Sequence, residues 1–280
     1  MNISIIGGDL RQLTLARLLA EEGYTVKIAG FDKNPDNFSD TAADIWESEV
    51  IILPVPASSD GRTIYAPFSA EPIILEEEKL SKAKLVLGGN INKTLACLLS
   101  SAGIKYIDYL KREELQIKNA LPTAEGAVEI AFAELPITLA SSKCLIVGYG
   151  RIGKILARLL QALGAEVTVS ARKCSDLAWI SVLGLKPAKT AELADIIKDY
   201  DVIFNTVPAM VLDETVLKET DPKTLIIDLA SKPGGVDFSI AKDLGLKVIW
   251  SLGLPGKVAP ITSGEIIAEA VINILTEMEV

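Results

Sequence analysis

Residues 145–153 read LIVGYGRIG and decide the fold of the second half of the chain. The glycines at 148, 150 and 153 follow an apolar run and open an amphipathic helical pattern. A GxGxxG turn between strand and helix is typical of dinucleotide sites, where Gly148 permits the turn, Gly150 admits a pyrophosphate and Gly153 lets helix and strand pack closely. The alternative is a purely structural turn. The cofactor-binding residues predicted here are Gly148, Tyr149, Gly150, Arg151, Ile152 and Gly153.

The next apolar run, at residues 165–170, is followed by residues that favour NADP over NAD. A site for NAD carries Asp or Glu at this point to bind the ribose hydroxyls, whereas this chain carries Arg172. A guanidinium suits the 2′-phosphate of NADP, although Arg172 could instead stack on adenine. Loops after later predicted strands complete the expected site. The remaining predicted cofactor residues are Ser170, Ala171, Arg172, Lys173, Thr206, Val207, Pro208, Ala230, Ser231, Leu254 and Pro255.

The first half of the chain contains a near-copy of the same segment. Residues 5–19, IIGGDLRQLTLARLL, match residues 146–160, IVGYGRIGKILARLL, at a constant offset of 141. Asp9 and Gln12 replace the second and third glycines, and a carboxylate there would repel phosphates, so we expect no dinucleotide in this half. Arg11, near a helix start, is predicted to bind a substrate carboxylate. An ion pair of Arg11 with Asp9 or Asp32 is the alternative.

Short apolar runs alternate with amphipathic helical patterns along the whole chain, which indicates an α/β fold with parallel sheets. We predict two Rossmann-like, doubly wound domains with a ligand-binding cleft between them. The first spans 1–120 and is completed by a C-terminal helix at 262–280, and the NADP-binding domain spans 141–261. A linking segment, 121–140, is predicted to hold a helix from Thr123 to Leu135, with Thr123 as its cap. Strands are predicted at 2–7, 24–29, 49–54, 84–88, 104–108, 143–148, 165–170, 201–206, 224–229 and 246–250.

Composition excludes several classes of function. The 280 residues carry a net charge of −9 without a basic cluster, which argues against nucleic acid and anionic membranes as partners. No apolar run approaches the ~20 residues of a membrane span and the start lacks a basic n-region, so a cytoplasmic protein is expected. The three cysteines are scattered and are expected to be free thiols. The absence of histidine excludes a Ser-His-Asp triad and the usual zinc sites, so no metal is predicted.

Proton transfer must therefore use other side chains, and two are candidates. Glu125, in the first turn of the linking helix, is either a catalytic base or an ordinary acidic residue at a helix N-terminus. Lys232, in the loop DLASKPGG, is either an acid or carboxylate ligand or a solvated surface lysine. Thr262 and Ser263 are expected to cap the last helix. The candidate substrate-binding residues are Arg11, Ser58, Ser59, Arg62, Asn90, Lys257, Thr262 and Ser263.

Several motifs outside GxGxxG resemble one family over essentially the whole chain. IIGGDLRQ, LPTAEGA, GYGRIG with SAR, DLASKPGG and GLPGKVAPITSGEI occur in the order found in the A-subunit of bacterial dipicolinate synthase. The resemblance implies NADP-dependent oxidation of a dihydrodipicolinate-type intermediate to pyridine-2,6-dicarboxylate during spore formation. It also implies a separate B-subunit as partner, and apolar helix faces favour a homo-oligomer.

Two other functions remain open at this point. The chain is similar in its last motif to alanine dehydrogenases, so an amino-acid or imine oxidoreductase of that type is one alternative. A non-catalytic protein that senses NADP and regulates a partner is the other.

Overall fold

The protein, seen in a computed structural model, divides into two compact units, and the structure describes residues 1–33 and 42–278. Unit 1 comprises Met1–Asn119 and Ala259–Val280, and unit 2 comprises Ala120–Val258. Each unit has a parallel β-sheet covered by helices on both faces, so the predicted fold class is confirmed. Among the described residues, no helix is both long and apolar enough to cross a bilayer.

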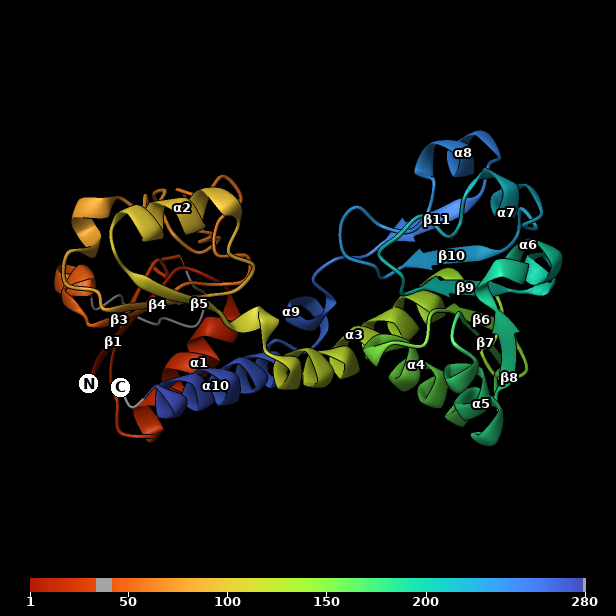
Figure 1. Cartoon of the computed structure of the whole chain (residues 1–280), viewed down its shortest axis with the longest axis horizontal. Coiled ribbons are helices and arrows are strands. Elements are labelled where there is room, and N and C mark those ends of the chain that lie inside the picture. Colours follow the sequence, from red (N-terminus) through yellow and green to blue (C-terminus); the bar gives the residue numbers. More distant parts are fainter. Residues whose placement is uncertain (34–41, 279–280) are drawn as a thin grey trace. The chain divides into compact units, whose positions relative to one another are not determined.

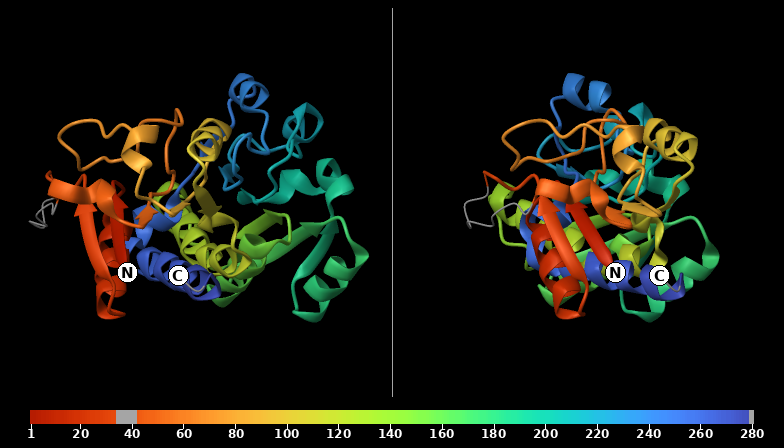
Figure 2. Two further views of the ribbon diagram at one scale, coloured as in Figure 1. Left: turned by 60° about the vertical axis from the view of Figure 1, so that its left-hand side comes forward. Right: turned by 90° about the vertical axis from the view of Figure 1, so that its left-hand side faces the viewer.

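The sheet of unit 1 has five parallel strands in the order β2-β1-β3-β4-β5. Helices α1 and α10 cover one face and α2 covers the other (Figure 1). Figure 2 shows the red strands β1 and β2 side by side. Ile3 and Ile5 pack against α1 and α10, while Ile51 and Val86 pack on the side of α2. The elements are β1 (Asn2–Ile6), α1 (Leu10–Glu21), β2 (Thr25–Ala29), β3 (Val50–Ile52), β4 (Leu85–Gly88), α2 (Lys93–Ser101), β5 (Lys105–Asp108) and α10 (Pro260–Glu277).

The sheet of unit 2 has six parallel strands in the order β11-β10-β9-β6-β7-β8. Numbered from its first strand, this is the order 3-2-1-4-5-6 of dinucleotide-binding domains, whose switch point lies between β6 and β9. Ile146 and Val169 pack against α3 and α4, and Leu145 and Ile203 face α6, α7 and α8. The elements are β6 (Lys143–Val147), α4 (Arg151–Ala162), β7 (Glu166–Ala171), α5 (Cys174–Val182), β8 (Lys186–Lys189), α6 (Leu193–Ile196), β9 (Val202–Asn205), α7 (Glu214–Lys218), β10 (Leu225–Asp228), α8 (Phe238–Asp243), β11 (Lys247–Trp250) and α9 (Leu254–Val258).

The repeated segment has the same structure in both units. β1 and β6, α1 and α4, and the starts of β2 and β7 are each separated by 141 residues, so the offset seen in the sequence persists without an insertion. The two sheets nevertheless differ beyond the repeat, because the order of unit 1 places its switch point between β1 and β3. Each unit therefore brings a different neighbouring strand to its glycine turn.

Two predicted helix starts are wrong. Helix α3 runs Glu113–Glu134 and contains Pro122, so Thr123 lies inside the helix and is not its cap. The residues before Pro122, EELQIKNAL, are mostly good helix formers, and the helix begins there at the expense of one backbone hydrogen bond. Helix α10 begins at Pro260 after Ala259, so Thr262 and Ser263 lie in its first turn. Proline is favourable at that first position because its missing N–H would be unpaired there.

Strand β8 was not predicted. Its sequence, KPAK, has two lysines and a proline and lacks the apolar run of the other strands. It forms an edge of the sheet, where proline is tolerated and one side of the backbone needs no partner. Its position matters for function because Lys189 lies opposite Ala171, the last residue of β7.

Candidate functional site

The glycine turn of unit 2 has the geometry that a dinucleotide requires. Gly148 has φ +103°, and a Cβ atom there would lie 2.5 Å from the hydroxyl oxygen of Thr206. A Cβ at Gly153 would clash with the carbonyl oxygen of Gly148, so α4 packs directly on the turn. A Cβ at Gly150 would meet no atom within 4 Å, so this residue borders open space. The three glycines thus permit the turn, the approach of a pyrophosphate and the close packing of the helix.

The N-terminus of α4 opens at this turn. Gly150 is its cap residue, and no side chain accepts a hydrogen bond from the first N–H groups. The Gly148 N–H donates to the Ser170 carbonyl at 3.0 Å, and the Thr206 hydroxyl donates to the Val147 carbonyl at 2.9 Å. The turn is therefore held between β7 and β9, at the switch point of the sheet. The uncapped N–H groups and the helix dipole suit a phosphate, so the residues present fit a nicotinamide dinucleotide.

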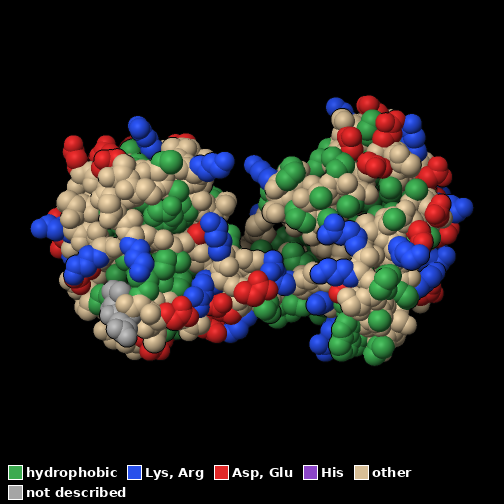
Figure 3. Space-filling view, viewed as in Figure 1, with side chains coloured by type: hydrophobic (Ala, Val, Ile, Leu, Met, Phe, Trp, Pro, Cys, Tyr) green, Lys and Arg blue, Asp and Glu red, His purple; other side chains and the backbone are tan. Residues whose placement is uncertain are grey.

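Cationic side chains gather at the end of β7. Arg172 and Lys173 are exposed, and Lys189 ends the neighbouring strand β8. A hydrogen bond of 2.9 Å to Glu192 raises the pKa of Lys189, which keeps it charged. Figure 3 shows Lys and Arg side chains over the part of unit 2 that contains α4 and the neighbouring strands. Sequence reasoning missed Lys189 because it missed β8.

Ser170 and Ala171, the last residues of β7, are buried, in contrast to Arg172. The Ser170 hydroxyl oxygen has no hydrogen-bond partner among the described residues. An unpaired buried hydroxyl is unfavourable, which makes this strand end a place where a ligand or water would be stabilising.

A buried carboxylate organises the loops after β9 and β10. Asp228 is fully buried and accepts hydrogen bonds from the Asn205 side chain at 2.8 Å and from the N–H groups of Ala230 and Gly235 at 3.0 Å. The Trp250 indole donates to the Ala230 carbonyl at 2.9 Å. This network fixes two predicted cofactor loops. Asn205 and Trp250 were not predicted, because only tertiary contact reveals their role.

The other predicted residues of these loops have varied surroundings. Thr206 and Val207 are half-buried, and Pro208 is exposed. Ser231 and Lys232 are exposed, next to the buried Ala230. In α9, Leu254 is buried in the core with α3 and α4, Pro255 is half-buried and Lys257 is exposed.

Glu125 is not brought to the glycine turn. It is exposed on α3 beside an apolar groove of about 480 Å³ that also involves Val128, Phe132 and the α4 residues Leu159 and Leu163. These α4 residues are in the last turn or just beyond it, whereas Gly150 precedes the first turn. A helix of 12 residues is about 18 Å long, so Glu125 lies well away from the turn.

The corresponding turn of unit 1 is closed by its own side chains. The Arg11 guanidinium donates to Asp9 at 2.8 and 2.7 Å and to the Val55 carbonyl at 2.8 Å. Asp9 also caps α1 by accepting from the Arg11 N–H at 3.1 Å. The alternative ion pair with Asp9 is thus present. Burial alone would lower the pKa of Arg11, but Asp9 raises it, so the guanidinium is charged.

Buried polar groups support this closed turn. A Cβ at Gly8 would collide with the side chain of Gln12, which fills the space that Gly153 leaves free in unit 2. Gln12 is fully buried and its Oε1 has no partner among the described residues. The buried Tyr109 donates to the Leu53 carbonyl at 2.9 Å, and burial raises the pKa of its hydroxyl. Gly8 donates its N–H to the Tyr65 carbonyl at 2.7 Å.

The first turn of α10 lies beside the first turn of α1. A Cβ at Gly264 would lie 2.6 Å from Thr14 Cβ and 2.7 Å from the Arg11 carbonyl. The structure therefore brings Thr262, which is exposed, and Ser263, which is buried, into the neighbourhood of Arg11. Two helix N-termini, both positive ends of dipoles, meet at this place in unit 1.

The remaining predicted residues of unit 1 lie in surface loops. Ser58 is buried and its hydroxyl donates to Asp60 at 2.9 Å, so it serves the loop. The backbone N–H groups of Arg62 and Thr63 and two hydroxyls hold the pKa of Asp60 well below its usual range. The other three predicted residues, Ser59, Arg62 and Asn90, are exposed.

Two family models match the chain. The model for the N-terminal domain of the dipicolinate synthase A-subunit matches residues 2–110. The model described as "D-isomer specific 2-hydroxyacid dehydrogenase, NAD binding domain" matches residues 129–231, which include the glycine turn.

Known relatives agree over the full length. The chain is 36% identical over 288 residues to the dipicolinate synthase A-subunit of Bacillus subtilis, covering 100% of this chain and 97% of that protein. The crystal structure of the dipicolinate synthase A-subunit from Bacillus halodurans has a TM-score of 0.92 and 34% identity, covering 98% of this chain and 97% of that one. A structure of L-alanine dehydrogenase has a TM-score of 0.69 at 16% identity, covering 100% and 90%, which shows a shared fold only.

Proposed function

The chain belongs to the dipicolinate synthase A-subunit family and is an NAD(P)-dependent oxidoreductase, and from this premise we propose that it oxidises a dihydrodipicolinate-type intermediate to dipicolinate with NADP. The open glycine turn of unit 2 carries the proposal, because Gly150 borders free space at an uncapped helix N-terminus. When bound there, the nicotinamide ring supplies the hydride acceptor of the reaction.

The proposed preference for NADP rests on charge at the end of β7. Arg172, Lys173 and Lys189 provide three cations and the strand end carries no carboxylate, so a 2′-phosphate would be attracted and ribose hydroxyls would lack their usual acceptor. Glu192, which pairs with Lys189, also orients that ammonium group. The planar guanidinium of Arg172 is the group best suited to bind phosphate through two parallel hydrogen bonds.

Unit 1 is proposed to bind a carboxylate of the substrate through Arg11. Asp9 and the Val55 carbonyl hold Nε and Nη2, which leaves Nη1 without a partner among the described residues. The guanidinium is thereby fixed in orientation before substrate binds, which reduces the entropy lost on binding. The adjacent N-termini of α1 and α10 add favourable dipoles for an anion, with Thr262 as a further donor.

The proposed chemistry needs little help from acids and bases. Oxidation of a dihydropyridine removes a hydride and a proton and yields an aromatic ring, which provides the driving force. No alcohol has to be deprotonated, so the absence of histidine is no obstacle. The residues of this chain mainly position the reactants and exclude alternatives.

Partner and cellular role are also proposals. The relatives are named as one lettered component of dipicolinate synthase, which indicates a multi-subunit enzyme, and we expect a protein of the B-subunit type as partner. Production of dipicolinate would place the protein in spore formation.

A pair of variants tests the cofactor proposal. Arg172→Glu should weaken NADP binding far more than NAD binding, because the 2′-phosphate would meet a carboxylate, and calorimetric titration of both cofactors measures the ratio. Lys198→Glu, an exposed lysine away from the turn, is the matched control for charge. Equal losses for the two cofactors would overturn the NADP assignment. Turnover of alanine, but not of a cyclic dicarboxylate, with the wild-type chain and its partner would overturn the substrate assignment.

A further inference from the structure

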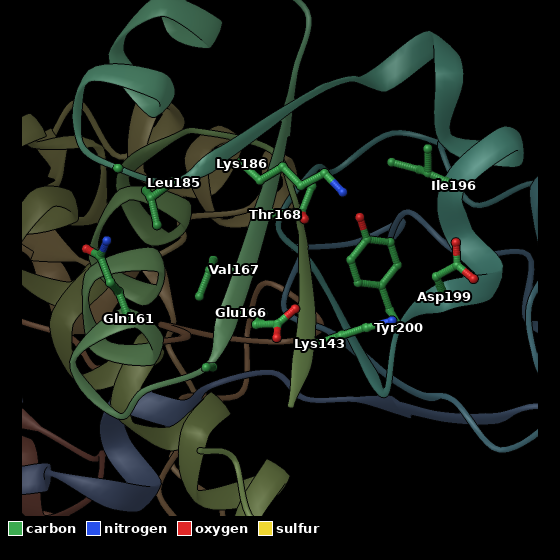
Figure 4. A pocket seen from close by; sticks show the side chains of 12 residues that line it. Lys143, Gln161, Glu166, Val167, Thr168, Leu185, Lys186, Ile196, Asp199 and Tyr200 are labelled. Atoms are coloured by element: carbon green, nitrogen blue, oxygen red, sulfur yellow. The ribbon is translucent and has the colours of Figure 1, made fainter. Parts of the chain in front are cut away.

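Unit 2 contains a second cavity at the opposite end of its strands from the glycine turn. The cavity has a volume of about 420 Å³ and lies at the amino ends of β6, β7 and β8, which begin with Lys143, Glu166 and Lys186 (Figure 4). The glycine turn, Arg172 and Lys189 all lie at the carboxyl ends of these strands. The cavity is therefore separate from the proposed cofactor site.

The pattern of β7 explains why this cavity exists. Val167 and Val169 pack into the core with α4, while Thr168 faces the other side of the sheet, in register with Leu145 and Lys186. On that side the cover consists of the four-residue helix α6 and the 3₁₀ turn Ile197–Asp199. Such short elements cannot cover three strands, so a space remains above Thr168.

Two buried hydroxyls open into this space without a partner. Tyr200 is 8% exposed and Thr168 is 4% exposed, and within residues 1–33 and 42–278 neither hydroxyl has a hydrogen-bond partner. Figure 4 shows both hydroxyls and the Lys186 ammonium directed toward the same region of the cavity. Over the same described residues, Lys186 forms no ion pair. Buried polar groups are normally satisfied, so this arrangement indicates a site for a ligand.

We propose that this cavity binds a small carboxylate-bearing metabolite through Lys186, Thr168 and Tyr200. One ammonium and two hydroxyl donors match the two oxygens of a carboxylate. Glu166 and Asp199 also line the cavity, so its net charge is not strongly positive and a phosphate dianion would be disfavoured. Leu185 and Ile196 provide apolar surface for the rest of the ligand. This inference does not depend on the proposed oxidation.

The test is an NMR titration of the full-length chain, labelled with ¹⁵N, using L-alanine and malonate as separate probes. Saturable shifts are expected for the amides of Thr168, Lys186 and Tyr200. Binding of alanine alone would identify a zwitterion, with its ammonium near the acidic residues, and binding of malonate alone would identify a dicarboxylate. Lys186→Ala should weaken binding by about tenfold, because it removes the charge-assisted hydrogen bond. Tyr200→Phe, which removes only a hydroxyl, should weaken it by roughly threefold to tenfold.

Lys198→Ala is the control, because Lys198 is an exposed lysine in the same 3₁₀ turn but does not line the cavity. It should bind the probes like the wild type, and all variants should keep their affinity for NADP. The proposal is overturned if neither probe shifts these amides in a saturable manner, or if Lys186→Ala binds as the wild type does.

Discussion

The turns after β1 and after β6 begin with the same backbone and end in opposite chemistry. Their cap residues, Asp9 and Gly150, have ψ of −162° and −161°, and each starts a helix of 12 residues. At Asp9 the chain places its own carboxylate on the helix N-terminus and neutralises it with Arg11. At Gly150 the same position is bare. One unit has thus filled internally the site that the other leaves free for phosphate.

This difference shows that a repeated fold does not fix a repeated function. A few side chains at the carboxyl ends of the strands decide what each unit can bind. In unit 1 Gln12 occupies the space beside Gly8, whereas in unit 2 Gly153 lets the helix touch the turn. The comparison can be broken or sharpened by exchanging features between the two units.

Gly150→Asp should have the largest effect. The backbone there suits a non-glycine residue and a new Cβ would meet open space, so folding should be preserved and α4 should gain a cap like that of α1. The carboxylate would oppose the pyrophosphate, and we expect NADP to bind at least about 100-fold more weakly, on the scale of an uncompensated buried charge. Titration calorimetry and thermal unfolding measure the two effects.

Gly150→Asn is the matched control for this variant, because it adds the same volume without charge. It should lose clearly less affinity than Gly150→Asp. If the two variants lose the same amount, crowding and not charge separates the two turns.

Cys144 tests a second contrast, within the paired strands. It corresponds to Ile3 at the offset of 141, and both side chains are fully buried. Burial is the main cause that raises the pKa of Cys144 to about 11. Since the unfolded value is about 8.5, its neutral form stabilises the fold fully below that pH, and the contribution is lost as pH rises through about 11. The loss should be on the order of 3 kcal/mol.

Denaturant unfolding of the wild type and of Cys144→Ala between pH 7 and the alkaline range measures this contribution. The stability difference between them should stay constant up to about pH 8.5 and shrink above it. A difference that does not change with pH would contradict the assigned role of burial.

The regular parts of the fold could be predicted from the sequence because their signals are local. Apolar runs, helical periodicity and the GxGxxG spacing need no knowledge of distant residues, and they suffice for the repeat and for the strands other than β8. Strand β8 escaped because KPAK becomes a strand only through its pairing with β7. The hydrogen bonds of Asp228 and the packing of Gln12 also join distant segments, so no local pattern announces them. For Arg11 the sequence left two interpretations, and the structure shows the ion pair with Asp9 while leaving Nη1 for a ligand.

Arg11→Ala should have an intermediate effect that is confined to the substrate. The apparent substrate constant should rise about tenfold, the scale of a lost charge-assisted hydrogen bond, while the affinity for NADP stays unchanged. Steady-state kinetics and cofactor titration measure the two quantities. Arg17→Ala is the control, because Arg17 is an exposed arginine on the same helix whose only described ion pair is with Glu21. Loss of cofactor affinity in Arg11→Ala would contradict the division of roles between the units.

The smallest effect should appear in the reactivity of two exposed thiols, one in each unit. Cys174 begins α5 directly after Lys173, beside the proposed site of the 2′-phosphate, whereas Cys97 lies on α2 in unit 1. Saturating NADP should slow alkylation of Cys174 several-fold, because a bound ligand restricts access, and should leave Cys97 unaffected. Mass spectrometry of the alkylated peptides resolves the two sites. Equal protection of both thiols would point to a general stiffening of the chain, and protection of Cys97 alone would place the cofactor on unit 1, against the comparison of the two turns.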